Sequence, residues 1–200
     1  MFDYDISRAA DLKSETQQIG LGLRRRDVTL LQALVEQYQY RLVRYLIYLL
    51  GRRDGVDDLV QETWLRVMER GSSYDGRSRF EPWLFTIARN LAIDHMRKRQ
   101  IFSLDSNDDK EWETDPTSPA SSAPSPFALA ARTEDAERLA HSLETLDSVY
   151  REALVLRFQE DLSLQEISTV VGAPVSTVSS RIYRGLATLR SQLEGANHDV

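Results

Sequence analysis

A segment rich in acids, serines and prolines divides this sequence into two parts, and it limits the possible folds more than any other feature. Residues 101–126 hold six carboxylates and then four prolines. Proline lacks a backbone N–H and clashes with the preceding helical turn, so no helix can continue through this segment, and its polar residues cannot build a core. The sequence therefore predicts a flexible linker over residues 101–135 between two modules, residues 28–100 and 136–195.

Both modules have the apolar spacing of helices. Apolar residues recur at every third or fourth position, and no alternating strand pattern occurs. In the first module this spacing predicts three helices, over residues 30–50, 56–67 and 82–99, with a loop rich in glycine and serine at residues 71–80. We therefore expect an all-α fold of two small helical domains.

The second module contains the sequence pattern of a helix-turn-helix. Ser163 and Glu166 have the spacing of a capping box, which begins a short helix. Gly172 and Pro174 end that helix, and Ser176 is expected to cap a longer one. Two helices joined by a tight turn that contains glycine are typical of DNA-binding proteins.

The second helix of this pattern has a polar face that suits the DNA major groove. Hydroxyl side chains occupy its first turn and arginines follow one turn later, where they can bind guanine or phosphate. A merely solvated basic face on a bundle helix is the competing interpretation. We expect DNA contacts from Ser176, Thr177, Ser179, Ser180, Arg181, Tyr183 and Arg184.

The first module also carries basic and aromatic residues, in its loop and toward the end of its third helix. This combination suits single-stranded or distorted DNA, because basic groups bind phosphates and rings stack on exposed bases. Core packing is the alternative for the rings, and for Trp83 it is the favoured one. The candidate contacts are Tyr74, Asp75, Arg77, Phe80, Trp83, Arg89, Asn90, Arg97, Lys98 and Arg99.

The charge is distributed unevenly along the chain. Residues 1–100 carry 17 basic and 14 acidic side chains, whereas residues 101–135 carry two and eight. Much of the net charge of −6 therefore lies in the linker. An acidic total of this kind does not exclude a nucleic-acid partner, because the basic residues are clustered elsewhere.

An acidic group lies on the polar side of the second expected helix. It consists of Asp57, Asp58, Gln61 and Glu62. Carboxylates at this spacing could hold a metal, but no histidine accompanies them, so no metal site is expected. A solvated helix start is the usual meaning of such acids.

Several classes of protein are excluded by what the sequence lacks. It has no cysteine, which removes disulfide and thiolate chemistry and indicates a reducing, cytoplasmic setting. Its longest apolar run, residues 45–50, is far too short to cross a membrane, and acids stand at the N-terminus where a signal peptide has bases. No nucleotide-binding, zinc-protease or serine-hydrolase motif occurs, so we expect neither an enzyme nor a cofactor.

With these motifs identified, residues 28–100 resemble the first domain of a bacterial RNA polymerase sigma factor of the extracytoplasmic-function group. Asp57-Asp-Leu-Val-Gln-Glu-Thr-Trp64 is similar to the family's helix that docks on the clamp helices of the largest polymerase subunit. Phe80-Glu-Pro-Trp-Leu-Phe-Thr-Ile-Ala-Arg-Asn-Leu-Ala-Ile-Asp94, followed by Arg97-Lys-Arg99, is similar to its promoter-melting and minus-ten recognition helix.

The second module, over residues 136–193, resembles the family's minus-thirty-five domain. Leu162-Ser-Leu-Gln-Glu-Ile-Ser168 and Thr177-Val-Ser-Ser-Arg-Ile-Tyr-Arg-Gly-Leu186 match its helix-turn-helix. Ser176 and Ser179 depart from the pattern, since glycine and a long side chain are common at these positions. The departures concern the base preference of the upstream element and not the fold.

The resemblance implies a role for each group of residues. The loop at residues 71–80 would capture a flipped non-template base, as proteins that read extruded bases do with a pocket and a ring. The implied partners are core RNA polymerase and promoter DNA, with an anti-sigma factor as a further candidate. The residues implied to bind core polymerase are Asp57, Asp58, Leu59, Gln61 and Glu62.

Two other functions remain open from the sequence. A stand-alone, dimeric helix-turn-helix regulator would bind a palindromic site tightly without polymerase. A helical adaptor that binds only protein would be indifferent to promoter DNA. Residues 1–27 lie outside the resemblance and form either a tail or an added helix of no assigned role.

Overall fold

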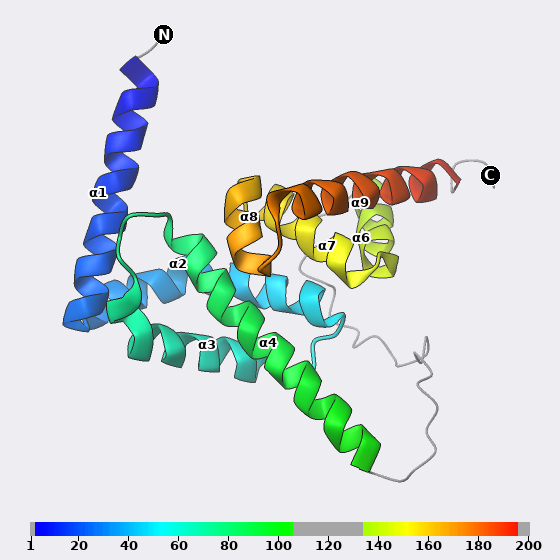
Figure 1. The fold of residues 1–200 in the computed structure, drawn as a ribbon, viewed down its shortest axis with the longest axis horizontal. Coiled ribbons are helices and arrows are strands. Elements are labelled where there is room, and N and C mark those ends of the chain that lie inside the picture. The colour runs from blue at the N-terminus through cyan, green and yellow to red at the C-terminus, as the bar shows by residue number, and fades with distance from the viewer. Residues whose placement is uncertain (1–2, 106–133, 196–200) are drawn as a thin grey trace.

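The computed structural model describes residues 3–105 and 134–195 (Figure 1). No strand occurs in these two ranges, which confirms the all-α expectation. α1 (Asp3–Arg25) precedes the first module, which contains α2 (Val28–Leu50), α3 (Val56–Arg70), the short η1 (Gly71–Ser73) and α4 (Phe80–Asp105). The second contains α6 (Glu134–Thr145), α7 (Ser148–Leu154), the π turn η2 (Val155–Gln159), α8 (Leu164–Val171) and α9 (Val175–Gly195).

Local sequence signals account for both ends of α2. The side chain of Asp27 accepts hydrogen bonds from the backbone N–H groups of Thr29 and Leu30, at 2.9 and 3.2 Å. At the other end Gly51 adopts a left-handed φ of +69° and donates its N–H to the carbonyl of Ile47. The helix therefore ends where the sequence predicts and begins at Val28, two residues before the predicted start.

Two segments are more helical than the sequence analysis expected. Residues 3–25 form α1, so the described part of the N-terminal segment is an added helix and not a tail. α4 continues to Asp105, beyond the expected end near Arg99, because no glycine or proline interrupts it there. Pro82 lies in its first turn, where a missing N–H breaks no helical bond.

The helix-turn-helix is formed by α8 and α9. The capping box at Ser163 and Glu166 is confirmed, and Gly172 ends α8 with a φ of +64°. The cap expected at Ser176 is wrong, because α9 begins at Val175 and its first backbone bond is accepted by the carbonyl of Pro174, 3.1 Å from the N–H of Val178. Ser176 lies inside the first turn because the fixed φ of proline already favours a helix start there.

The two modules are in direct contact, which the sequence did not indicate. One cluster of buried side chains extends from Leu42 and Phe85 in the first module to Leu156 and Ile167 in the second. α8 packs on α4 and α7 packs on α2 (Figure 1). The second domain thus lies on the first through a shared apolar core.

The described helices include none that is both long enough and apolar enough to span a bilayer. Within the same residues, no group of histidine, aspartate and glutamate side chains could hold a metal ion.

Candidate polymerase-binding and nucleic-acid-binding surfaces

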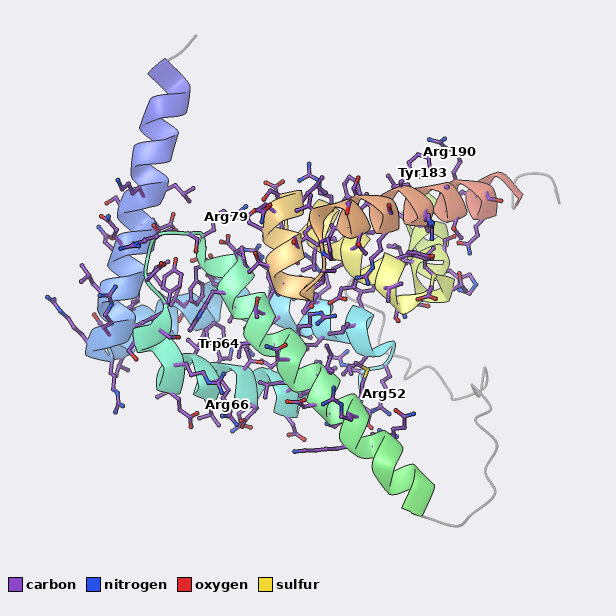
Figure 2. The ribbon with its side chains drawn as sticks, viewed as in Figure 1. Arg52, Trp64, Arg66, Arg79, Tyr183 and Arg190 are labelled. Carbon is purple, nitrogen blue, oxygen red and sulfur yellow. The ribbon has the colours of Figure 1, made fainter. Side chains whose placement is uncertain are left out.

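The start of α3 presents an acidic face to solvent. Asp57, Asp58 and Gln61 are exposed, and Glu62 is half-buried because its carboxylate accepts a 2.8 Å bond from Arg66 Nε. Leu59 is only 6% exposed and packs in the core, so it shapes the helix and presents no side chain to a partner. Figure 2 shows Arg66 on the outer side of α3, with Trp64 of the same helix directed into the domain.

An aromatic cluster supports the loop between η1 and α4. The rings of Tyr74 and Phe80 meet edge to face with centroids 5.5 Å apart, and Trp83 lies 5.4 Å from Tyr74. The Tyr74 hydroxyl donates to the carbonyl of Ser78 at 2.6 Å. Tyr74 and Phe80 are 2% and 1% exposed, so in this conformation both rings hold the loop from beneath and neither faces solvent.

The exposed part of this loop is polar. Asp75 and Arg77 are exposed, and the Asp75 carboxylate accepts a bond from the backbone N–H of Arg77 at 2.9 Å. This local bond fixes the turn at Gly76, whose φ is +69°. Of the residues expected to contact the minus-ten strand, Asp75 and Arg77 are therefore those that the loop presents.

The other exposed candidates lie along α4. Asn90, Arg97, Lys98 and Arg99 are all exposed, and Arg99 Nη1 donates to the carboxylate of Asp54 at 3.1 Å. Three consecutive basic side chains on one helix form a surface that attracts phosphates.

Arg79 and Arg89 make contacts with the second domain. Arg89 Nε donates to the Glu152 carboxylate at 2.8 Å, and the Tyr45 hydroxyl donates to the same oxygen at 2.9 Å. Arg79 Nη1 donates to the backbone carbonyl of Asp161 at 2.9 Å (Figure 2). The minus-ten candidate Arg89 is thus occupied by a protein carboxylate in this arrangement.

A third contact between the domains involves Glu160, whose side chain has no exposed surface. Its two oxygens accept bonds from Arg41 Nε at 2.7 Å and from Arg44 Nη2 at 2.9 Å. A buried carboxylate held by two guanidinium groups is a strong, geometrically specific contact. Neither Glu152 nor Glu160 was among the residues predicted to be functional. Their only signal in the sequence is a charge next to apolar helix positions.

The helix-turn-helix surface is open. Ser176, Ser179, Ser180 and Arg184 are exposed, and the Tyr183 ring is 76% exposed. Thr177 and Arg181 are half-buried, because they lie nearer to the side of α9 that packs in the core through Val178. Figure 2 shows Tyr183 and Arg190 pointing outward from α9, and Arg190 is an exposed basic residue outside the predicted DNA contacts.

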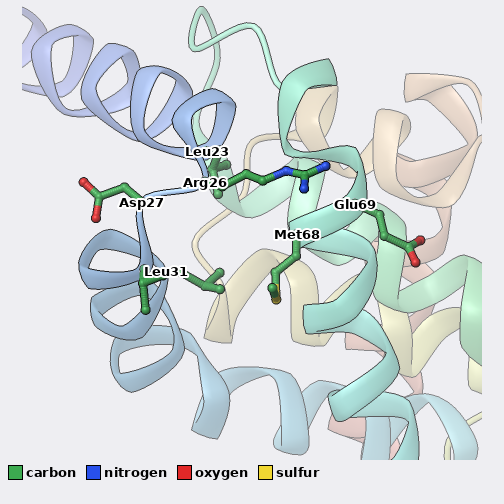
Figure 3. Close-up of a pocket in the computed structure, with 7 residues that line it drawn as sticks. Leu23, Arg26, Asp27, Leu31, Met68 and Glu69 are labelled. Atoms are coloured by element: carbon green, nitrogen blue, oxygen red, sulfur yellow. The ribbon is translucent and has the colours of Figure 1, made fainter.

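A cavity of about 190 Å³ lies where α1, α2 and α3 meet (Figure 3). Its lining is mostly apolar, and Val28 and Met68 at its rim are 75% and 52% exposed. The charged residues around it come from the α1–α2 junction and the end of α3. The lining consists of Leu23, Arg26, Asp27, Val28, Leu31, Met68 and Glu69.

These features define an all-helical protein with a basic, loop-bearing first module and a second module that carries a helix-turn-helix, a motif typical of DNA-binding proteins. Two family models match the chain, sigma-70 region 2 over residues 34–101 and sigma-70 region 4 over residues 136–189. The chain belongs to the extracytoplasmic-function sigma factors of bacterial RNA polymerase. As a sigma factor it directs transcription initiation, acting with core RNA polymerase and promoter DNA, so a stand-alone regulator is not favoured.

The relatives cover most of both chains. The ECF RNA polymerase sigma factor SigW of Bacillus subtilis is 30% identical over 162 residues, 80% of this chain and 87% of that protein. The RNA polymerase sigma factor CarQ of Myxococcus xanthus is 34% identical over 138 residues, 68% and 74% of the two chains. A solved structure of the sigma factor RpoE of Bartonella quintana, in complex with the anti-sigma factor NepR, is similar with a TM-score of 0.62 and 25% identity, covering 82% of this chain and 96% of that one.

Proposed function

We propose that the two domains divide promoter recognition between them. The first, residues 28–100, binds core polymerase and reads and melts the minus-ten element. The second, residues 136–195, binds the minus-thirty-five element. The observation that best supports this division is the open polar face of α9, where hydroxyls and Arg184 are exposed at the start of a recognition helix.

The acidic start of α3 is the proposed core-binding surface. Asp57 and Asp58 project from the first turn into solvent, where their charges can meet a basic partner surface. Leu59 contributes by packing beneath them. The double substitution Asp57→Asn and Asp58→Asn should weaken binding to core polymerase, whereas Glu69→Gln at the far end of α3 should not.

The proposed minus-ten surface consists of the loop tip and the basic end of α4. Asp75 and Arg77 lie at the tip, where an extruded base would be received, and Arg97, Lys98 and Arg99 supply phosphate contacts. Tyr74 and Phe80 act indirectly, because their buried rings fix the loop.

Two further basic residues of the first domain, Arg79 and Arg89, can contact DNA only if the two domains separate. Arg89 is bound by Glu152 and Arg79 by the backbone of Asp161, so neither can contact DNA while the second domain is docked. The described arrangement is thus a closed form of the factor, and promoter binding by both domains would open it.

An anti-sigma factor is the further proposed partner, as the similar Bartonella structure is a complex with one. An apolar groove of about 330 Å³ on the second domain supports this proposal, with Phe158 at 62% and Leu186 at 43% exposed. Such a groove fits the apolar face of a partner helix. Phe158→Glu should weaken the complex with a purified anti-sigma factor, measured by calorimetry.

We also propose that the protein works in the cytoplasm and catalyses nothing itself.

Transcription in vitro tests the proposed function. Core polymerase with this protein added should initiate at defined sites on a genomic template pool, and mapped start sites should share two upstream elements. The Asp57→Asn, Asp58→Asn variant should lose this activity and Glu69→Gln should keep it. Identical transcripts with and without the protein would reject the proposal.

A further inference from the structure

The second half of α1 lies against the loop at residues 71–80. Thr16, Ile19 and Leu23 of α1 are each at most 6% exposed. α1 contacts η1, and Figure 1 shows the loop that leads to α4 running beside this helix. α1 precedes both family-model matches, the first of which begins at residue 34. A helix outside the recognised region therefore touches the loop proposed to read the minus-ten element.

Two glycines let the backbones of the helix and the loop come into contact. A Cβ atom on Gly20 would lie 3.2 Å from the Cα of Gly76, and one on Gly76 would lie 2.9 Å from the carbonyl oxygen of Thr16. Gly76 also has a left-handed φ of +69°, which residues with a side chain rarely adopt. Gly76 therefore needs glycine for this crossing, and a side chain at position 20 would press on the backbone of Gly76.

Further contacts flank the crossing. Arg24 Nη2 lies 3.4 Å from the backbone carbonyl of Asp75, to which it donates. At the start of the loop, a Cβ on Gly71 would lie 3.0 Å from the Cβ of Leu23. From beneath, the buried Tyr74 ring supports the same segment. The loop is thus held from two sides, and its tip stays exposed.

We propose that α1 is a positioning element for the minus-ten loop, with Gly20 and Arg24 as positioning residues. This inference rests on the proposed function of the loop. A loop with two glycines samples many conformations when unsupported, and ordering it during base capture lowers affinity. α1 restricts those conformations before DNA binds, so it sets how well one base is distinguished from another without touching DNA.

The test compares Gly20→Val with Gln18→Val in the full chain assembled with core polymerase. Both variants place valine in α1, where valine is a better helix former than glycine and a slightly poorer one than glutamine, so neither is expected to break the helix. Position 18 is exposed, whereas position 20 faces the loop. Gly20→Val should weaken binding of a non-template single strand carrying the minus-ten element by about tenfold, the size expected for one lost well-formed contact. It should also reduce discrimination between minus-ten sequence variants.

The controls separate loop displacement from unfolding. Core binding and binding to an upstream duplex should stay at the level of Gln18→Val, and thermal unfolding should remain cooperative. If Gly20→Val does not fold, Arg24→Ala replaces it, with Arg25→Ala as the charge-matched control. Arg24→Ala alone should then reduce minus-ten discrimination.

The outcomes distinguish this inference from the proposed function beneath it. If the wild-type holoenzyme discriminates minus-ten variants and Gly20→Val and Arg24→Ala do so equally well, the role of α1 is overturned and the function of the loop stands. If the wild-type holoenzyme does not discriminate them, the proposed function of the loop is itself wrong, and the role of α1 is overturned with it.

Discussion

The Nε atom of Arg41 donates to a carboxylate oxygen of Glu160 at 2.7 Å, although 119 positions separate the two residues in the chain. The second oxygen of Glu160 is held by Arg44, so two arginines of α2 enclose one carboxylate of the other domain. Removing a carboxylate from water is unfavourable unless such partners replace its hydration. The contact between the domains therefore combines a shared apolar core with a specific pairing of charged side chains.

Replacing Glu160 by alanine should open the closed form. The change leaves Arg41 and Arg44 without their carboxylate and removes two charge-assisted hydrogen bonds, each worth about 1.5–3 kcal/mol. We expect a lower free energy of unfolding in urea and a larger radius of gyration by small-angle X-ray scattering. Glu36→Ala removes the same charge from an exposed position and should change neither. A variant at Glu160 as compact and stable as the wild type would contradict this account.

Opening should also uncover Arg89, which we propose to bind DNA. Glu152→Gln keeps the shape of the side chain but removes the charge that holds Arg89 at 2.8 Å. Without core polymerase, the variant should bind a minus-ten single strand several-fold more tightly than the wild type, as fluorescence anisotropy would show. Glu69→Gln is the exposed control. Unchanged affinity would mean that the docked domain does not mask this surface.

The closed form should lose stability in alkali. Burial raises the pKa of Tyr38, Tyr45 and Tyr74 above the ordinary value of 10, and the Glu152 carboxylate adds to the rise at Tyr45. A raised pKa in the folded state means that folding favours the protonated phenol, so this stabilisation is complete below pH 10 and is lost as the pH rises toward the folded values.

The measurement is the free energy of unfolding as a function of pH. It should fall with increasing slope above pH 10, where the phenols of the unfolded chain ionise first. Tyr45→Phe should flatten this fall, because one buried phenol is gone, while lowering stability at neutral pH through loss of the bond to Glu152. Tyr183→Phe, at an exposed ring, should have the wild-type slope.

The sequence predicts what local interactions determine. The capping box at Ser163 and the left-handed Gly51 follow from residues within one turn, so their spacing alone identifies them. The apolar spacing likewise identifies the buried side of each helix. In α9, the residues on the opposite side then form the polar face. In these parts of the fold and the site, residues close together in the sequence determine the conformation.

Contacts between distant segments are beyond such reasoning. Nothing near Arg41 indicates that its partner is Glu160, because periodicity gives the face of a helix and not what covers it. The sequence leaves core packing and DNA contact equally open for the rings of Tyr74 and Phe80, and tertiary packing buries both. The sequence assigned no role to α1 for the same reason. Gly20 matters because its backbone lies against that of Gly76, and nothing in the sequence indicates this contact.

Base contacts and phosphate contacts of the α9 arginines can be distinguished by substitution. Arg181→Ala and Arg184→Ala should each weaken binding to the upstream duplex by about 1–3 kcal/mol if they contact bases, and relax the preference at one position. A phosphate contact would instead weaken all sequences alike and reduce the salt dependence of binding. Titrations of each variant in holoenzyme at several salt concentrations separate these cases. Arg190→Ala, farther along the helix, is the control, and wild-type affinity in both variants would remove α9 from the interface.

Substitution of Gly172, in the turn between α8 and α9, tests whether the left-handed backbone conformation at this position supports the recognition helix. Gly172 has a φ of +64°, and a Cβ atom added there would meet nothing within 4 Å. Gly172→Ala should therefore destabilise the chain only through the left-handed backbone, by about 1–2 kcal/mol. Gly172→Asn should lose less, since asparagine tolerates this conformation better than alanine. The expected order in thermal unfolding is glycine, asparagine, alanine, and upstream-duplex binding should follow it. Equal stability of the alanine and glycine proteins would show that the turn relaxes out of its left-handed state.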